Sequence, residues 1–150
     1  SGNIAVARIE GDLAGGPGGP GGPGGPGGPG GAVPRCAGKQ ATIVGTKRSE
    51  RLKGTRRNDV IVALGGNDKI AGGRGNDIIC GGDGNDRVDG GNGNDRVDGG
   101  NGKDTLAGGA GKDALIGGPG KDKLSGGAGR DSCNGGASKD SAACEKRKSI

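Results

Sequence analysis

Residues 81–100 read GGDGNDRVDGGNGNDRVDGG and state one nine-residue phrase twice, each copy carrying an aspartate at the same place. The spacing continues in strict register far beyond this stretch. Ten aspartates follow it: Asp59, Asp68, Asp77, Asp86, Asp95, Asp104, Asp113, Asp122, Asp131 and Asp140. A phase held over ten copies indicates a repeat architecture in which each nonapeptide is one structural unit.

The composition would not support an ordinary globular domain. The chain has 42 Gly in 150 residues, no aromatic residue and no His, and only 27% of it is hydrophobic. Ordinary cores of this size contain aromatic side chains, and so polar and glycine-rich a chain is typical of disorder. We therefore expect the repeat, together with a ligand, to provide the order.

Each part of the phrase has a structural meaning. GGxGxD is complete seven times, from Gly72–Asp77 through Gly126–Asp131, and degenerate at 54–59 (GTRRND), 63–68 (ALGGND) and 135–140 (GGASKD). Glycines at these places permit the positive φ of a tight turn. The next three residues predict a short strand whose middle side chain points inward. The inward series is Ile43, Leu52, Ile61, Ile70, Ile79, Val88, Val97, Leu106, Leu115, Leu124, Cys133 and Ala142.

Two nonapeptides make one 18-residue coil, with two turns and two strands. Stacked coils predict an all-β fold of two short-stranded parallel sheets that face each other over a thin apolar core. Turns on the same side of the stack then come from every second nonapeptide. One side stacks the aspartates from Asp68 to Asp140 and the other those from Asp59 to Asp131.

These stacked aspartates predict a metal. Strand spacing places neighbouring carboxylates about 5 Å apart, and each unneutralised pair costs roughly 1–3 kcal/mol. A divalent cation removes that cost, and carboxylates with turn carbonyls form the flexible all-oxygen cage that Ca²⁺ prefers over Mg²⁺. The candidate carbonyl ligands are Gly73, Gly75, Gly82, Gly84, Gly91, Gly93, Gly100, Gly102, Gly109, Gly111, Gly118, Gly120, Gly127 and Gly129.

The repeats from Gly45 to about Ala142 resemble the RTX nonapeptide, GGxGxDxUx, of bacterial calcium-binding β-rolls. The resemblance implies a right-handed parallel β-roll with Ca²⁺ held between turn n and turn n+2. Three further pairs, 59/77, 68/86 and 122/140, each include a degenerate turn, so the resemblance implies five to eight ions. The five pairs of complete turns are Asp77/Asp95, Asp86/Asp104, Asp95/Asp113, Asp104/Asp122 and Asp113/Asp131.

The thin core also predicts that folding depends on the metal. The inward side chains are small, and ordering a glycine-rich chain is entropically costly. We expect the chain to be largely unfolded without Ca²⁺, so that binding and folding are one event.

Four cysteines without a metal-type CxxC spacing indicate an oxidising, extracellular setting. Of the three possible pairings we expect Cys36–Cys80 and Cys133–Cys144; free buried thiols are the alternative. Cys133 is an inward position close to Cys144. Cys80 points outward beside Val60, Val62 and Ile78, an apolar patch that the segment after Cys36 is placed to cover.

The remaining segments differ in kind from the repeats. We divide the chain into a short N-terminal segment (1–14), with the alternation of a weak strand, a PGG-rich linker (15–35), the β-roll (36–144) and a basic tail (145–150). The linker favours flexible polyproline-II structure over a collagen helix because each triplet carries two glycines. The chain contains no apolar run long enough to span a membrane.

The net charge and the residue types limit the functions that the sequence supports. The formal net charge is +5, and calcium-loaded aspartates would leave the roll strongly basic. This predicts either attraction to an anionic cell-surface polymer or lipid, or solvated lysines that offset the aspartates. Nucleic acid is not expected because no aromatic can stack on a base. No His or activated nucleophile supports an enzyme. We expect a secreted calcium-binding structural or interaction module; the alternatives are a calcium-dependent ice-binding protein or an accessory C-terminal domain of a secreted hydrolase or toxin.

Overall fold

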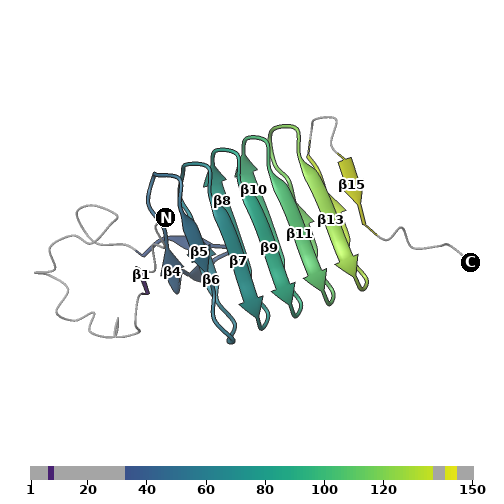
Figure 1. Cartoon of the computed structure of the whole chain (residues 1–150), viewed down its shortest axis with the longest axis horizontal. Coiled ribbons are helices and arrows are strands. Elements are labelled where there is room, and N and C mark those ends of the chain that lie inside the picture. Colours follow the sequence, from purple (N-terminus) through teal and green to yellow (C-terminus); the bar gives the residue numbers. More distant parts are fainter. Residues whose placement is uncertain (1–6, 9–32, 137–140, 145–150) are drawn as a thin grey trace, which may run out of the picture.

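The computed structural model describes residues 7–8, 33–136 and 141–144. These residues form strands and turns, with no helix among them and hence none able to cross a membrane. The predictions for most of the PGG-rich linker, for Asp140 and for the basic tail concern positions outside the described residues. Two parallel sheets lie face to face, and their strands alternate along the chain as coils of a β-roll (Figure 1).

One sheet has six strands, all parallel, and its members lie side by side in Figure 1. In spatial order they run from the C-terminal end of the roll to its N-terminal end. They are β15 (Ser141–Ala143), β13 (Lys123–Ala128), β11 (Thr105–Ala110), β9 (Arg87–Asn92), β7 (Lys69–Arg74) and β5 (Arg51–Lys53).

The second sheet has seven strands, and a short antiparallel hairpin of β2 (Arg35–Cys36) and β3 (Lys39–Gln40) lies beside it. Its first pair, β1 with β4, is antiparallel and the others are parallel. Its strands are β1 (Ala7–Arg8), β4 (Ile43–Val44), β6 (Val60–Val62), β8 (Ile78–Asp83), β10 (Arg96–Asn101), β12 (Ala114–Ile116) and β14 (Ser132–Asn134).

The register confirms the predicted coil of two nonapeptides. Val97 of β10 pairs with Leu115 of β12, two nonapeptides further along the chain, and every other parallel pair has the same offset, such as Leu106 with Leu124. Several strands have the three residues predicted, such as β5 and β12, whereas others are longer: β7, for example, spans six and includes the first two glycines of the following turn motif. Glycines can extend the strand because they pair with glycines of the next coil, as Gly73 does with Gly91.

The core is the predicted inward column. From Ile43 to Leu124 the column is buried, and Cys133 packs against it at the C-terminal end. Ala142 is the exception, because its side chain is exposed although β15 keeps the register, pairing it with Leu124. It lies in the last strand of its sheet, where no further described coil covers it.

A disulfide lies near each end of the roll, and both disulfides have the predicted pairing. Cys36 is bonded to Cys80 with a Cα–Cα distance of 5.9 Å, and Cys133 to Cys144 with 6.0 Å. Cys36 and Ala41 pack on Val60 and Val62, so the segment around the β2–β3 hairpin covers the outward apolar patch as expected. β1 pairs with β4 of the same chain and borders the N-terminal edge of the sheet.

Candidate metal centre

The aspartates of the repeats lie where each turn meets the following strand. They are buried from Asp59 to Asp122, and Asp131 is half-buried. Such burial is unusual for carboxylates, which are seldom fully buried unless they are paired. The register of the coils stacks them in two columns, one along each turn edge of the roll, as the spacing predicts.

One oxygen of each carboxylate is held by the neighbouring coil. The amide of Asp77 donates to Asp95 Oδ1 at 2.8 Å, and the amide of Asp86 donates to Asp104 Oδ1 at the same distance. The bond recurs along both columns at 2.7–2.9 Å, with Asp68, Asp77, Asp86, Asp113, Asp122 and Asp131 also accepting from the residue 18 positions earlier. These bonds fix each carboxylate between two turns.

The second oxygen, Oδ2, is buried without a donor in most of these turns. This holds for Asp68, Asp77, Asp86, Asp95, Asp104, Asp113 and Asp131. A buried acceptor that lacks a hydrogen bond costs about 1–3 kcal/mol, and more when it carries charge. Burial of a column of such oxygens away from water is therefore unfavourable on its own. A bound cation beside the column would satisfy these oxygens.

A backbone carbonyl faces the same space as the unpartnered oxygen of Asp77, Asp86, Asp95 and Asp113. A Cβ built on Gly90 would lie 2.6 Å from Asp95 Oδ2 and 2.6 Å from the carbonyl oxygen of Gly108, in the next turn of the stack. Gly81 gives 2.5 Å to Asp86 Oδ2 and 2.6 Å to the carbonyl of Gly99. In these motifs the first glycine thus keeps open a space lined by a carboxylate oxygen and a carbonyl oxygen.

The other glycines of the motif set the turn itself. All fourteen glycines predicted as carbonyl ligands have positive φ, between 92° and 138°. Their carbonyls point along the stack: a Cβ on Gly93 would collide with the carbonyl oxygen of Gly75, in the preceding turn of the same column. The ligands predicted from the sequence do not include the carbonyls of the first glycines. The carbonyl of Gly108 nevertheless lines the space beside Asp95 Oδ2, and the GG pair at the start of every complete motif could have suggested it.

The oxygen donors of this centre are mostly backbone atoms. Within the described residues, no three Asp, Glu, Cys or His side chains meet closely enough to hold a metal. Two carboxylates from stacked turns and the turn carbonyls are instead the available ligands. Such an all-oxygen set suits a hard cation, and the variable turn geometry suits Ca²⁺ better than the strictly octahedral Mg²⁺.

Burial shifts the acidity of these side chains. Four of the aspartates have a pKa of about 6 instead of the ordinary 3.8. Desolvation raises the pKa most and neighbouring carboxylates add to the rise, whereas the backbone hydrogen bond that each carboxylate accepts lowers it. This applies to Asp68, Asp77, Asp86 and Asp104. Desolvation raises the pKa of Asp95 and Asp113 in the same direction. With a pKa of about 6, Asp68, Asp77, Asp86 and Asp104 remain largely ionised at neutral pH and need a counter-charge.

The first turn of each column is built differently. Asp59 Oδ2 accepts from the amide of Thr55 at 2.6 Å and from its hydroxyl at 2.9 Å. In the other column Glu50 occupies the aspartate position, and its carboxylate accepts from the amide (3.2 Å) and the hydroxyl of Thr46. Both turns begin Gly-Thr, so protein donors here take the place left open in later turns. Sequence reasoning missed Glu50, which one further step of nine before Asp59 would have found.

A second ladder runs beside the aspartates. Asn58 Oδ1 accepts from the amide of Asn76 at 2.7 Å, and Asn94 Oδ1 accepts from the amide of Lys112 at 2.9 Å. The same bond joins Asn67, Asn76 and Asn85 to the amide of the equivalent residue in the next coil. These side-chain amides hold successive turns together in the N-terminal half of the roll.

The profile of the RTX calcium-binding nonapeptide repeat (4 copies) matches residues 44–79, 81–115 and 107–142, more than half of the chain. The matched residues carry the turns and both carboxylate columns described above.

The chain belongs to the RTX calcium-binding nonapeptide repeat family. No curated protein and no solved structure matches it. Membership of the RTX family establishes the repeats as a calcium-binding module on a β-roll scaffold. It also agrees with the oxygen ligands described above, because the glycines and the aspartate of the RTX motif lie at the positions that line the space beside Oδ2.

Proposed function

We propose that this RTX chain is an extracellular structural or interaction module, without catalytic activity, whose repeats fold around Ca²⁺ held between stacked GGxGxD turns. The observation that carries the proposal is the column of buried Oδ2 atoms without donors, from Asp68 to Asp113 and at Asp131. Bound calcium would supply the positive charge that these paired carboxylates require.

The chain's own residues prepare each site. The amide of one aspartate orients the carboxylate of the next by the Oδ1 bond, as between Asp77 and Asp95. Positive-φ glycines such as Gly93 aim their carbonyls along the stack, and the first glycine keeps side chains out of the space between turns. Burial excludes water that would otherwise solvate the carboxylates.

The geometry supports fewer ions than the upper count of eight. The five pairs of complete turns each have two aspartates and two complete sets of turn glycines, and the 68/86 pair has an unpartnered Oδ2 on both aspartates. The 59/77 pair includes Asp59, whose Oδ2 is already held by Thr55. We therefore propose five or six ions, apart from the 122/140 pair, one member of which lies outside the described residues.

Two features support an extracellular setting. The structure contains two disulfides, which persist in oxidising compartments. Sites built from flexible oxygen ligands commonly bind Ca²⁺ at about 10⁻⁴–10⁻³ M in extracellular modules, a concentration range that would keep the module loaded outside cells.

The module role is preferred over ice binding. Ice binding would want a regular, flat column of like side chains, whereas the exposed third position of the turns changes from Arg74 to Asp83, Asn92 and Pro119 along the roll. A freezing-hysteresis measurement on the calcium-loaded chain tests this directly, and the module role predicts no hysteresis.

Counting the ions tests the proposal. Equilibrium dialysis against ⁴⁵Ca²⁺, with excess Mg²⁺ present, is expected to give five or six bound ions for each chain, or one more if the 122/140 pair also binds. Binding of fewer than two ions, or complete displacement by Mg²⁺, would contradict it. Loss of calcium binding after Asp95→Asn and Asp104→Asn would locate the ions in the two columns.

A further inference from the structure

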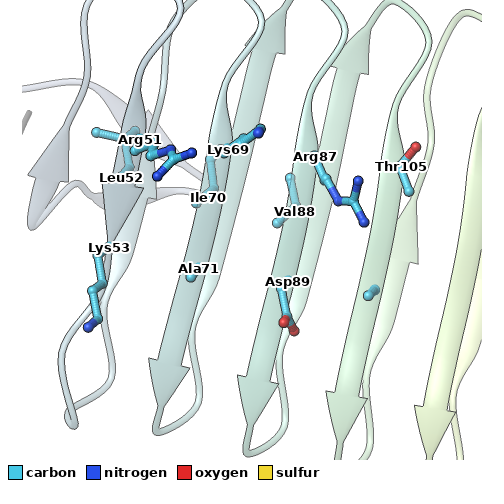
Figure 2. Close-up of a pocket in the computed structure, with 11 residues that line it drawn as sticks. Arg51, Leu52, Lys53, Lys69, Ile70, Ala71, Arg87, Val88, Asp89 and Thr105 are labelled. Carbon is cyan, nitrogen blue, oxygen red and sulfur yellow. The ribbon is translucent and has the colours of Figure 1, made fainter. Parts of the chain in front are cut away.

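The outer face of the six-stranded sheet carries a groove of about 510 Å³, which we call the basic groove (Figure 2). It runs across β5, β7, β9 and β11. Figure 2 shows the charged ends of Arg51, Lys69 and Arg87 lying across it, with Arg87 extending toward Thr105. Its lining is Arg51, Leu52, Lys53, Lys69, Ile70, Ala71, Arg87, Val88, Asp89, Thr105 and Ala107.

The three cations form a row set by the register. Arg51 pairs with Lys69, and Lys69 with Arg87, on neighbouring parallel strands. Strand spacing places them about 4.8 Å apart along the roll axis at the backbone. All three are exposed, and the structure gives none of them an ion pair with another of the described residues. A row of unneutralised like charges is a site that attracts a linear polyanion.

The positive surface continues past the groove. A second hollow, also of about 510 Å³, is lined by Lys53, Arg56 and Arg74 together with Gly54, Thr55, Gly73 and Asn92. Lys53 lines both hollows. The positive surface is therefore elongated, which suits a chain-like ligand better than a single small anion.

The lining is not wholly basic, and this indicates the chemistry of the ligand. Asp89 and Thr105 offer an acceptor and a hydroxyl beside the cations, and the methyl groups of Ala71 and Ala107 leave a shallow apolar floor. A sugar chain presents hydroxyl groups and an apolar ring face as well as any acidic substituents. We propose that the basic groove binds an acidic polysaccharide, whose carboxylate or sulfate groups contact Arg51, Lys69 and Arg87 while Asp89 accepts from its hydroxyl groups.

Other anionic partners match this lining less well. Single-stranded nucleic acid is usually held by stacking on aromatic side chains, and the chain has none. Membrane surfaces are bound through protruding apolar side chains beside the basic ones, whereas the apolar part of the groove is its floor. Both remain as outcomes of the test below.

The groove exists only while the roll is folded, so the inference rests on the calcium-built fold, and the test separates the two. Binding is measured by biolayer interferometry at saturating Ca²⁺ with an oligogalacturonate, a dextran sulfate and neutral dextran. Far-UV circular dichroism on every variant shows whether the roll is intact, so that loss of fold and loss of the groove are distinguished.

The variants are matched in charge. Arg51→Gln with Lys69→Gln and Arg87→Gln removes the row, and Lys39→Gln with Arg96→Gln and Lys112→Gln removes three exposed cations elsewhere. We expect the first set to weaken binding of the acidic glycans by roughly tenfold or more, as the loss of three solvent-exposed ion pairs implies, and the second by less than about twofold. Equal losses from both sets would mean attraction by net charge alone and would overturn the proposal.

A single substitution identifies the ligand class. Asp89→Ala removes a negative charge, so it tightens the binding of a simple polyanion and weakens a glycan that donates hydroxyl hydrogen bonds to this carboxylate. We expect weaker oligogalacturonate binding. Tighter binding after Asp89→Ala, or binding of polyphosphate, oligonucleotide or phosphatidylserine vesicles that is stronger than that of the acidic glycans and is lost with the Arg51, Lys69 and Arg87 set, would overturn the proposal.

Discussion

The amide of Thr55 lies 2.6 Å from Asp59 Oδ2, and its hydroxyl lies 2.9 Å from the same oxygen. At Asp77 and Asp95, in later turns, the same oxygen has no donor among the residues that the structure describes. The contrast divides one repeated motif into two kinds of turn: a first turn closed by threonine, and later turns whose carboxylates are left open.

This contrast predicts different effects of equivalent substitutions. Asp59→Asn should leave the number of bound calcium ions unchanged, because threonine already satisfies that carboxylate. Asp95→Asn should remove up to two ions, because Asp95 belongs to the 77/95 and the 95/113 pairs. Equilibrium dialysis of the two variants side by side provides the comparison. An equal loss from both would show that Thr55 does not close its turn.

A methyl group in the space between turns should weaken calcium binding, as Asp95→Asn does. Gly90→Ala would place a Cβ 2.6 Å from both Asp95 Oδ2 and the carbonyl oxygen of Gly108. Overpacking of this kind costs about 1–3 kcal/mol, so we expect a lower melting temperature and a higher calcium midpoint in circular dichroism. Asn92→Ala, at an exposed position of the same turn, is the control. If the two variants behave alike, the space is not needed for calcium.

Acidity should affect the metal-free and calcium-loaded forms in opposite directions. Burial raises the pKa of Asp68, Asp77 and Asp104 to about 6 from 3.8. Because the pKa of these side chains is higher in the folded chain than in the unfolded chain, their protonation stabilises the fold. This stabilisation is fully present below about pH 4 and is lost as the pH rises through 6.

The metal-free chain should therefore gain β structure on acidification from pH 7 to 4, while its calcium affinity falls because protons compete for the same carboxylates. Circular dichroism in calcium-free buffer at each pH, and calcium titrations at pH 5 and 7, measure both. Unchanged calcium affinity at pH 5 would show that the aspartates of the two columns are not the ligands.

The disulfides should stabilise the roll to different extents. Cys36–Cys80 spans 44 residues and Cys133–Cys144 spans 11, and the loop-entropy relation gives about 4 and about 3 kcal/mol respectively. Replacing each pair by serine and measuring thermal unfolding at saturating Ca²⁺ tests this. A smaller effect for the first pair would mean that the packing of Ala41 on Val60 and Val62 already holds the hairpin in place.

The nine-residue phase alone was enough to predict the core, the coil of two nonapeptides and both aspartate columns, because each depends only on residues that recur at fixed spacing. The six-residue strands were not predictable in this way. Gly73 pairs with Gly91 only because coils stack, and a glycine pair read locally indicates a turn. The exposure of Ala142 likewise depends on its place in the last strand of a sheet.

Parts of the site were missed for a related reason. The threonine closure of Asp59 and Glu50 requires donors from Thr55 and Thr46, whose direction depends on a turn that departs from the repeat. The carbonyls beside each Oδ2, such as that of Gly108, come from the next turn of the same column, and their convergence with Asp95 is a property of the stacked coils.

The most direct test of a calcium-built roll is a calcium titration followed by far-UV circular dichroism, with Mg²⁺ as the control and fluorescence excluded because the chain has no Trp or Tyr. We predict a steep gain of β signal with Ca²⁺ and little or none with Mg²⁺. A spectrum that Ca²⁺ does not change, whether folded or unfolded, would contradict the claim that the aspartate columns hold the metal and that the metal builds the roll.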